Sequence, residues 1–273
     1  MKYRLIATDL DGTLLDREGE ISPENWKAVK EMKERDVYFV PASGRCFAEL
    51  PEQLRESELI RYYILSGGAV VYDKEQDRFE MTCPEKTVKD WILDTIFRYP
   101  VCLMAHTGRE SLVDASQHNA ASYESYNMNS YWVEYALEKE KPMENLKEYL
   151  YKLDELPMIV IFFRNMDDLN ACKKTLNGEK EILVVQSDPC NLEVVSRKAG
   201  KGNAMLSLAA SLGLSVEQTV AVGDSHNDRT MLEVAGLSLA MKNAMPEMQA
   251  IADEVICDNN SHCAKYILDH YLS

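Results

Sequence analysis

Short apolar runs alternate with helical patterns at both ends of the chain. In the N-terminal part the pattern predicts strands at 5–7, 37–40 and 63–65, a helix that opens at Ser22-Pro23, and a hairpin formed by 70–72 and 79–81. In the C-terminal part it predicts strands at 219–222, 237–241 and 254–256, and helices at 202–212 and 229–235. Buried strands that alternate with helices are typical of a doubly wound, mostly parallel α/β sheet.

The alternation changes between Pro84 and Ser196, where the pattern indicates a second α+β unit. It predicts helices near 88–96 and 169–176 and strands at 101–105, 112–113, 158–163, 182–185 and 192–195, with a polar stretch between 113 and 158. We therefore expect a core domain made of residues 1–83 and 197–273, and an inserted domain of residues 84–196. Hinges are expected near Cys83-Pro84 and Ser196-Arg197, where the two patterns meet.

The composition is that of a globular protein, because 46% of the 273 residues are hydrophobic and 27% are charged. No stretch approaches the roughly 20 apolar residues that a membrane span needs, so no membrane segment is expected. The first apolar run is short and meets Asp9 and Asp11, which does not fit a secretory signal. A cytoplasmic location is therefore expected.

Charge and cysteine content narrow the range of partners. There are 30 Lys+Arg and 45 Asp+Glu residues, a formal net charge of -15, which argues against nucleic acid or an anionic membrane as the main partner. A small anionic substrate fits this charge if its pocket is locally cationic. The seven cysteines show no paired metal-ligand spacing, so we expect reduced thiols and no zinc.

Four polar segments lie where doubly wound sheets bind ligands, at the carboxyl ends of strands or at a helix start. In an extended backbone Asp9 and Asp11 point to one side, and such close carboxylates repel unless a cation or proton lies between them. Mg2+ favours such oxygen ligands, and Asp224 could complete a site with Asp228 at its edge. A lone Asp-x-Asp is also found in solvated turns and helix caps, but two acidic segments at two strand ends disfavour that alternative. The segments are Asp9-Leu10-Asp11-Gly12-Thr13, Ser43-Gly44-Arg45, Lys201-Gly202 and Gly223-Asp224-Ser225-His226-Asn227-Asp228.

Other residues in these segments allow two interpretations each. Ser43 and Gly44 offer a hydroxyl and backbone N–H groups at an expected helix N-terminus, which suits an anion, yet serine there is also an ordinary N-cap. Lys201 would bind a phosphate oxygen if it points inward, and is otherwise a solvated lysine. His226 has no orienting partner nearby in the sequence, so a surface or supporting role is expected rather than that of a general base.

In this order, the four segments resemble the four motifs of the haloacid dehalogenase superfamily. The inserted domain looks like the large α/β cap of its Cof-type phosphatase branch, and Ala240-Met241-Lys242-Asn243-Ala244 looks like the segment after that branch's fourth motif. The resemblance implies a Rossmann-like core domain and a cap domain that closes over the substrate and supplies specificity.

The resemblance also implies a role for each matching catalytic residue. Asp9 would be the nucleophile that forms an aspartyl-phosphate. Asp11 would be the general acid for the leaving alcohol and then the general base for the hydrolytic water. Ser43 would hydrogen-bond the phosphoryl group, and Lys201 would offset negative charge on that group and on Asp9.

A Mg2+ site and a substrate site are implied in the same way. Mg2+ would be held by the Asp9 carboxylate, the Asp11 backbone carbonyl and Asp224, with Asp228 in support. The implied substrate-binding residues are Gly44, Arg45, Asn227 and Asn243, of which the two asparagines would be secondary, positioning or substrate-facing groups. The sequence departs from the branch in three places, namely Ser43 for the more common threonine, Gly67 for an asparagine, and a tail after Asn259 without an acidic-glycine pair.

We therefore predict a Mg2+-dependent phosphatase that acts on a small phosphorylated metabolite, such as a sugar phosphate or a related phosphomonoester. A phosphomutase would use the same residues and pass the phosphoryl group to a second hydroxyl. A non-catalytic metabolite-binding protein is another alternative, disfavoured because a binder gains little from two repelling carboxylates. An esterase would instead use Gly223-Asp224-Ser225 as its nucleophile segment, with Asp269-His270 as partners.

Overall fold

The computed structural model describes residues 2–272 and divides into two compact units. The core unit combines the chain up to Gly44, Pro51–Glu80 and the chain from Gly200 onward. The inserted unit combines Arg45–Leu50 with Met81–Ala199. None of the helices in the described residues is long and apolar enough to cross a membrane.

The borders of the two units differ in detail from the predicted domains. The sequence predicted the changes of domain at 83/84 and 196/197, and the structure has them at 80/81 and 199/200. The structure also groups Arg45–Leu50 with the inserted unit, because the Ala48 N–H donates to the Arg109 carbonyl (2.9 Å) and the Arg109 guanidinium lies over the Phe47 ring. Nothing in the local hydrophobic pattern marks these long-range contacts.

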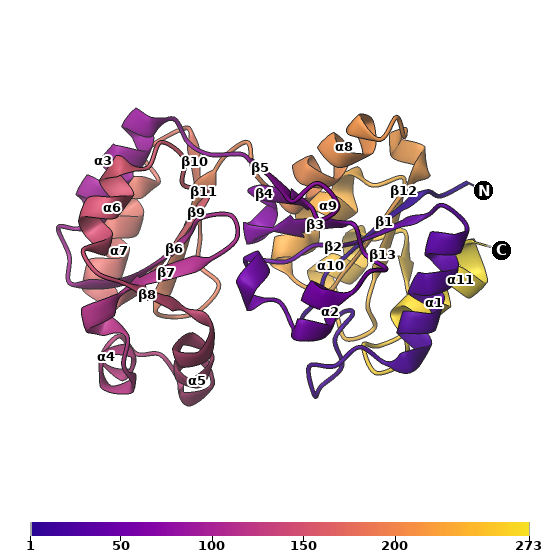
Figure 1. Ribbon diagram of the computed structural model, residues 1–273, viewed down its shortest axis with the longest axis horizontal. Helices are drawn as coiled ribbons and strands as arrows, with labels where there is room; N and C mark the ends of the chain where they lie inside the picture. The colour runs from indigo at the N-terminus through magenta and orange to yellow at the C-terminus, as the bar shows by residue number, and fades with distance from the viewer. Residues whose placement is uncertain (1, 273) are drawn as a thin grey trace. The chain divides into compact units, whose positions relative to one another are not determined.

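In the core unit, five parallel strands form one sheet. They are β1 (Leu5–Thr8), β2 (Tyr38–Pro41), β12 (Thr219–Gly223), β13 (Leu237–Ala240) and β14 (Glu254–Val255), in the order β14-β13-β12-β1-β2 (Figure 1). β1 and β12 are buried along their whole length, as expected for strands covered on both faces. The doubly wound parallel sheet predicted from the sequence is confirmed.

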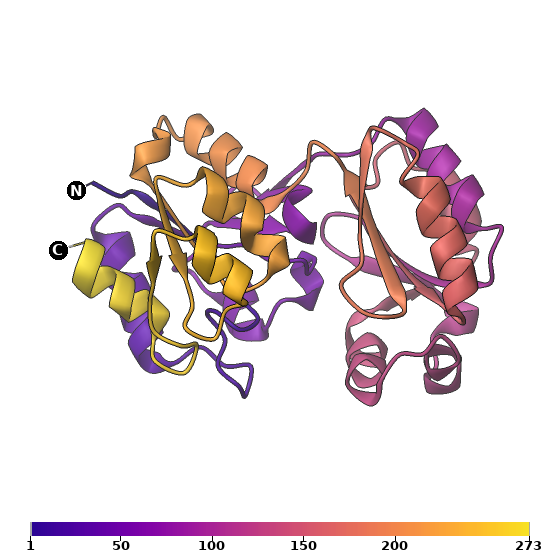
Figure 2. The ribbon, with the colours of Figure 1, turned by 180° about the vertical axis from the view of Figure 1, so that it is seen from behind.

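Five helices accompany this sheet, namely α1 (Pro23–Glu34), α8 (Lys201–Ser211), α9 (Arg229–Val234), α10 (Pro246–Ile251) and α11 (Cys263–Tyr271). α1 and α11 lie side by side (Figure 1), and α9 and α10 lie against the strands in the view of Figure 2. The predicted start of α1 is confirmed, because the Ser22 hydroxyl accepts from the Asn25 N–H (3.2 Å) and Pro23 is the first helical residue.

A smaller three-stranded sheet, β3-β4-β5, completes the core unit. It consists of β3 (Tyr62–Leu65), β4 (Val70–Asp73) and β5 (Arg78–Met81), and the short helix α2 (Glu52–Glu56) precedes it. β3 and β4 are antiparallel, and a single bridge between Ala42 and Ile64 joins β3 to the end of β2. The run at 63–65 is thus a strand, as predicted, but it lies outside the parallel sheet.

The inserted unit has a six-stranded sheet between two helical layers. Its strands are β6 (Val101–His106), β7 (Ser111–Asp114), β8 (Lys141–Met143), β9 (Met158–Phe163), β10 (Ile182–Val185) and β11 (Asn191–Ser196), in the order β10-β11-β9-β6-β7-β8. Alternate residues of β6 enter two different cores, Leu103 with one and Met104 with the other, so the sheet is covered on both faces.

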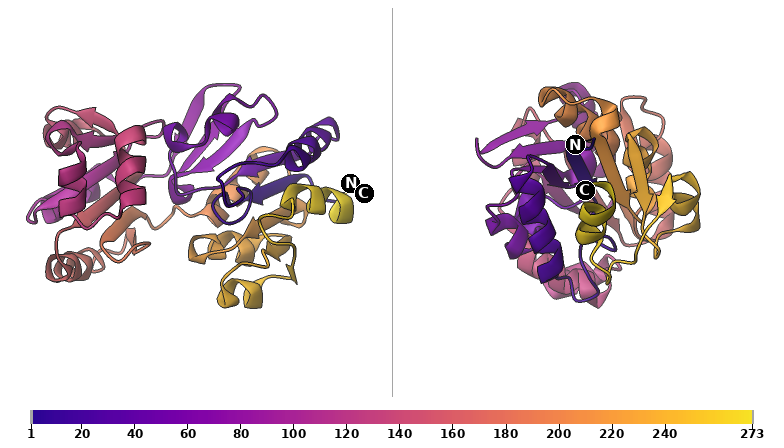
Figure 3. Two further views of the ribbon diagram at one scale, coloured as in Figure 1. Left: turned by 90° about the horizontal axis from the view of Figure 1, so that it is seen from below. Right: turned by 90° about the vertical axis from the view of Figure 1, so that its right-hand side faces the viewer.

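Helices of different lengths cover the two faces (Figure 3). α3 (Lys86–Ile96), α6 (Leu146–Lys152) and α7 (Met166–Leu176) supply the core on one side, and α4 (Ala120–Ser125) and α5 (Ser130–Lys139) supply the other. The sequence predicted a polar stretch between 113 and 158 and missed α4, α5, α6 and β8. These elements are short and bury few residues each, so they leave little periodic signal.

Two buried carboxyl groups of the inserted unit, Glu49 and Glu140, lie close together. The Ser111 hydroxyl donates to Glu140 (2.6 Å), and His106 lies 3.7 Å from the Glu49 carboxylate. Burial and the charge of Glu49 raise the pKa of Glu140 well above its usual range. The folded protein therefore holds the Glu140 proton more tightly than the unfolded chain does.

Glu140→Gln is expected to become more stable relative to the wild type as the pH rises. A raised carboxyl pKa stabilises the folded state fully below the unfolded-state pKa of about 4.3, and this stabilisation is lost at higher pH. Glutamine cannot ionise, so the variant does not lose this stabilisation. Urea unfolding should therefore show that the unfolding free energy of the variant, relative to that of the wild type, is higher at about pH 8 than at about pH 5. Exposed Glu134, changed to Gln, is the control; a pH-independent difference for Glu140→Gln would contradict the prediction.

Candidate active site

The carboxyl ends of β1 and β12 bring two acidic segments together. The strands are adjacent and parallel, and Thr8 is in register with Val222. Asp9 follows β1 and donates its backbone N–H to the Val222 carbonyl (2.9 Å), and Asp224 follows β12. This edge of the sheet is where ligands bind in doubly wound folds.

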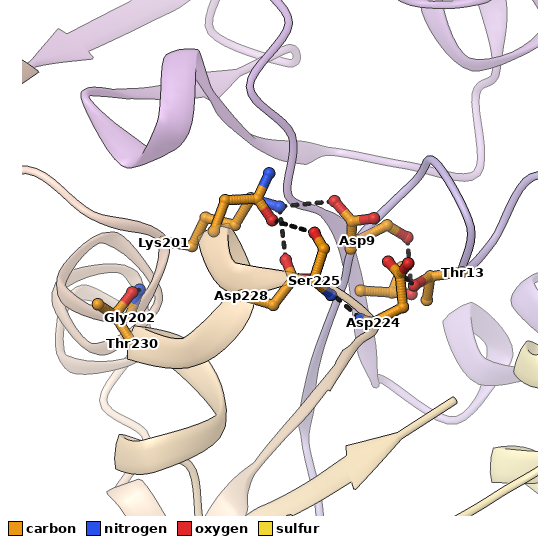
Figure 4. A network of polar contacts seen from close by, with 10 residues as sticks. Asp9, Thr13, Lys201, Gly202, Asp224, Ser225, Asp228 and Thr230 are labelled. Atoms are coloured by element: carbon orange, nitrogen blue, oxygen red, sulfur yellow. Dashed lines mark hydrogen bonds and ion pairs between the residues drawn. The ribbon is translucent and has the colours of Figure 1, made fainter. Parts of the chain in front are cut away.

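A buried lysine joins two of the carboxylates (Figure 4). Lys201 Nζ lies 2.6 Å from Asp9 Oδ1 and 2.6 Å from Asp228 Oδ1. Asp9 is 4% exposed, Lys201 1% and Asp228 0%. Lys201 is the first residue of α8, and the structure shows that it points inward, the orientation that phosphate binding requires.

The electrostatics of this group follow from its burial. Burial, and after it the charge of Asp228, raise the pKa of Asp9 well above its usual range, although Lys201 opposes them. Burial alone would lower the pKa of Lys201, but the Asp228 and Asp9 carboxylates outweigh it and raise that pKa. One lysine thus faces two buried acidic groups, and negative charge remains to be offset.

Asp224 lies beside this group and contacts the first acidic segment directly. Its Oδ1 accepts a hydrogen bond from the Thr13 hydroxyl (3.2 Å). Burial and the charge of Asp228 raise the pKa of Asp224 to about 6. Gly12 has a φ of +84°, and a Cβ there would lie 2.6 Å from Asp224 Oδ2, so only glycine lets the two loops approach this closely.

Asp228 holds the backbone of the loop after β12, which we call the second acidic loop. Its Oδ2 accepts the backbone N–H groups of Asp224 (2.9 Å) and Ser225 (3.0 Å), while its Oδ1 accepts from Lys201. Both carboxylate oxygens therefore already have donors, and Asp228 acts on the site through Lys201 and the backbone. At the same strand end, the Ser225 hydroxyl donates to Asn227 Oδ1 (2.8 Å).

The acidic group fits a divalent cation by its donor chemistry. Asp9, Asp224 and Asp228 each offer an oxygen, and these atoms all lie within 4.8 Å of one another. Carboxylate oxygens are the hard ligands that Mg2+ prefers, and a cation there would offset the remaining charge. The Asp11 side chain is exposed and does not belong to this group of carboxylates.

The segment after β2 differs from its expectation. Ser43 is buried, its N–H donates to the Ile64 carbonyl (2.8 Å) and its carbonyl accepts from the Gly67 N–H (3.0 Å). The expected helix N-terminus at Ser43 and Gly44 is wrong, because the next helix is a three-residue 3-10 turn, Phe47–Glu49. The contacts to the small β3-β4-β5 sheet, rather than a helix cap, hold this segment.

Two of the four expected substrate-binding residues make well-defined contacts with the protein. Arg45 donates to the Glu49 carbonyl (3.3 Å) and to the Tyr135 hydroxyl (3.4 Å) within the inserted unit. Asn243 Nδ2 donates to the Gly12 carbonyl (2.7 Å), and its Oδ1 accepts from the Asn259 N–H (3.0 Å). The sequence did not predict these contacts. They attach Arg45 to a backbone carbonyl and to the Tyr135 hydroxyl, and they attach Asn243 to two backbone groups.

The other two expected substrate-binding residues, Asn227 and Gly44, and also His226, have fewer contacts that indicate a role. Asn227 is exposed and accepts from Ser225, and a Cβ at Gly44 would meet no atom within 4 Å. His226 is exposed, which agrees with a surface role. The structure thus collects Asp9, Lys201, Asp224 and Asp228 into one buried group.

Sequence reasoning gave no role to several residues that position this group. Gly68 has a φ of +91°, and a Cβ there would lie 2.1 Å from the Gly200 carbonyl carbon, so the turn after β3 packs directly on the start of α8. The Thr13 hydroxyl donates to Asp224 Oδ1, and Asn259 Nδ2 donates to the Leu15 carbonyl. Only the glycine pair at 67 and 68 gave a local signal, since adjacent glycines indicate a tight turn or a close backbone approach.

The partners required for an esterase are engaged elsewhere. The Ser225 hydroxyl donates to Asn227, His270 Nδ1 pairs with the Tyr266 carbonyl one turn earlier on α11, and Asp269 pairs with Lys265. The nucleophile-to-base hydrogen bond that an esterase triad needs is not among these contacts.

Comparisons with known proteins identify the family of this chain. A family model for haloacid dehalogenase-like hydrolases matches residues 6–268. The phosphatase YwpJ of Bacillus subtilis is 30% identical, over 98% of this chain and 100% of its own length. The 5-amino-6-(5-phospho-D-ribitylamino)uracil phosphatase YwtE of Bacillus subtilis is 26% identical, over 99% and 98%.

A solved structure supports the same assignment. A haloacid dehalogenase-like hydrolase from B. subtilis superposes with a TM-score of 0.78 at 28% identity, over 99% of this chain and 100% of that one. The resemblance to the Cof-type branch, based on the four motifs, is therefore confirmed. This chain belongs to the haloacid dehalogenase-like hydrolase family, and within that family it is a phosphatase.

Proposed function

We propose that this enzyme hydrolyses a small phosphomonoester with Mg2+ as its cofactor and an aspartyl-phosphate on Asp9 as its intermediate. The observation that carries the proposal is the buried group in which Lys201 fixes one oxygen of Asp9 (2.6 Å) beside the carboxylate of Asp224. Phosphoryl transfer depends chiefly on placement and on charge compensation, and this group supplies both.

In the first half-reaction, Asp9 attacks phosphorus. Lys201 binds Oδ1 of Asp9, so the attack comes from Oδ2, and the bond between phosphorus and the leaving alcohol oxygen breaks. Asp11 gives a proton to that oxygen, so the product leaves as a neutral alcohol. Asp11 is exposed at the loop surface, where it can reach a bound substrate.

In the second half-reaction, water attacks the phosphorus of the aspartyl-phosphate. Asp11, now ionised, takes a proton from the water, the bond between phosphorus and Asp9 breaks, and phosphate leaves. Ser43 hydrogen-bonds the phosphoryl oxygens, and Lys201 offsets their charge. The carboxylate of Asp9 is regenerated with its original charge.

The cofactor would be held by the carboxylates of Asp9 and Asp224 and by the backbone carbonyl of Asp11. Mg2+ bound there would screen the charges of nucleophile and phosphate from each other and orient the phosphate for in-line attack. Asp228 supports the site through its hydrogen bonds to the Asp224 N–H and to Lys201. The assignment of Mg2+ follows from the all-oxygen donor set.

The substrate proposed is a sugar phosphate or a related metabolite in the cytoplasm. One relative, YwtE, has a name that specifies a phosphorylated ribityl chain, which is a sugar-alcohol phosphate. Another group of relatives carries the name HMP-PP phosphatase. A screen should therefore include hexose and pentose phosphates, the ribitylaminouracil phosphate, nucleotides and cofactor phosphates.

Phosphate release from this screen, with and without Mg2+, tests the proposal. We expect release to require Mg2+, to stop when a chelator is added, and to resume when Mg2+ is restored. Denaturing the enzyme during turnover should trap a phosphorylated protein that hydroxylamine cleaves, as an acyl phosphate requires. Transfer to a second hydroxyl without phosphate release would indicate a phosphomutase, and turnover in chelator would contradict the role of the metal.

A further inference from the structure

The position of the Asp11 carboxyl depends on the backbone of its loop. Asp11 is exposed, so core packing does not fix its side chain. The loop is closed by short-range hydrogen bonds, in which the N–H groups of Thr13 (3.2 Å) and Leu15 (2.9 Å) donate to the Leu10 carbonyl. Because this loop carries Asp11, the contacts that hold the loop against the rest of the core unit contribute to where the carboxyl lies.

Two asparagines from distant parts of the chain bind the outward-facing carbonyls of the loop. Asn243 Nδ2 donates to the Gly12 carbonyl (2.7 Å), and Asn259 Nδ2 donates to the Leu15 carbonyl (2.9 Å). The backbone N–H of Asn259 also donates to Asn243 Oδ1 (3.0 Å), so the Asn243 side chain is bound to the backbone of the second asparagine. We call Asn243 and Asn259 the asparagine pair.

The segment that carries Asn243 also holds the second acidic loop. The Met245 N–H donates to the Asp224 carbonyl (2.9 Å), and the Met241 N–H donates to the Gly223 carbonyl (3.1 Å). One short segment thus contacts the loop of Asp11 on one side and the loop of Asp224 on the other. These backbone hydrogen bonds contribute to the spacing between the two loops.

We propose that Asn243 and Asn259 are positioning residues that align the Asp11 carboxyl with the leaving oxygen of the substrate. The inference rests on the proposed function, in which Asp11 is the general acid. It differs from the expected substrate contact of Asn243, because both ends of that amide already bind the protein. The asparagine pair acts through the backbone at Gly12 and Leu15 and does not touch the reacting atoms.

The leaving group of the substrate distinguishes this role from a general structural one. An alkoxide is a poor leaving group and needs a proton from the general acid, whereas a nitrophenolate leaves as a stable anion. General acid catalysis contributes about 10²–10⁴-fold, and a misplacement of about 1 Å can lose about 10²-fold. A misplaced Asp11 should therefore slow alkyl phosphates much more than aryl phosphates.

The experiment compares Asn243→Ala and Asn259→Ala with the wild type on glycerol phosphate and para-nitrophenyl phosphate at saturating Mg2+. We expect kcat/KM, which reports the first half-reaction and not the second one that both esters share, to fall about 10- to 100-fold for glycerol phosphate and about threefold or less for the aryl ester. Lys242→Ala is the matched control, since Lys242 is the exposed neighbour of Asn243, and it should keep the wild-type ratio of the two rates.

Equal losses on both substrates would overturn the inference, because a destabilised or metal-depleted site slows both reactions alike. A rise in KM that is equal for both esters, with kcat unchanged, would overturn it in favour of a substrate contact by Asn243. Thermal unfolding shows whether either variant is impaired in folding. Each variant removes a different hydrogen bond to the loop, Asn243→Ala the one to the Gly12 carbonyl and Asn259→Ala the one to the Leu15 carbonyl. If one fails to fold, the ratio measured with the other decides.

Asp11→Asn separates failure of this inference from failure of the proposed function. If Asp11→Asn discriminates between the two esters and the asparagine variants do not, only the positioning role is wrong. If Asp11→Asn lowers kcat/KM equally for both esters, the general-acid role of Asp11 fails, and the positioning role fails with it.

Discussion

Asp9→Asn is expected to reduce phosphate release by roughly 10⁴-fold or more, because it removes the nucleophile and leaves only binding and charge stabilisation. An amide oxygen does not form the acyl phosphate that the reaction requires. The substitution keeps the shape of the side chain, and asparagine can still accept a hydrogen bond from Lys201 at the position of Oδ1. The protein should therefore stay folded.

The measurement combines phosphate release with trapping of the phosphorylated protein. The wild type should yield a hydroxylamine-sensitive phosphoprotein, and Asp9→Asn should yield none. Asp167→Asn is a suitable control, because Asp167 is an exposed residue in the first turn of α7 and the same change of charge occurs outside the acidic group of the core unit. If Asp9→Asn retained most of the wild-type rate in Mg2+, Asp9 would not be the nucleophile.

The strand ends at Asp9 and Asp224 could be located from sequence because their signal is local. Each follows a short apolar run that is buried along its length, and parallel strands end on the same edge of a sheet. Tertiary packing decides that β1 and β12 are direct neighbours. Their carboxyl ends, however, lie on the same edge in any parallel sheet that contains both strands. That is why the acidic group was foreseen and its hydrogen bonds were not.

The parts that escaped prediction depend on contacts between distant positions. The inward orientation of Lys201 follows from the packing of Gly68 on the Gly200 backbone, which brings β3 and α8 together across more than a hundred residues. The roles of Asn243 and Asn259 follow from loops that meet only in the folded protein. Polar side chains in loops carry no periodic pattern, so their partners could not be inferred.

The grouping of Arg45–Leu50 with the inserted unit has the same origin. Its contacts with Arg109 and Tyr135 join residues that lie about sixty and ninety positions apart in the chain. The local pattern instead suggested a strand-to-helix turn, and a 3-10 turn formed in its place. Short segments of this kind take their conformation from the surface on which they pack.

Lys201→Met is expected to lower the free energy of unfolding by about 3–5 kcal/mol, the usual effect of removing one partner from a buried ion pair. Methionine fills similar space, so the loss comes from charge: Asp9 and Asp228 would remain buried near each other without their shared cation. Urea unfolding at neutral pH in chelator measures it. Exposed Lys242→Met should change stability by about 0.5 kcal/mol or less.

The double variant Lys201→Met/Asp9→Asn tests the cause of that loss. If repulsion and desolvation of the carboxylates are responsible, removing one charge should make the double variant more stable than Lys201→Met alone, although Asp9→Asn removes a further polar contact. Additive losses would instead assign the effect to packing of the lysine stem. If the double variant is the more stable, Lys201 both orients the nucleophile and offsets the cost of burying its charge. Activity and stability at this site then cannot be changed independently.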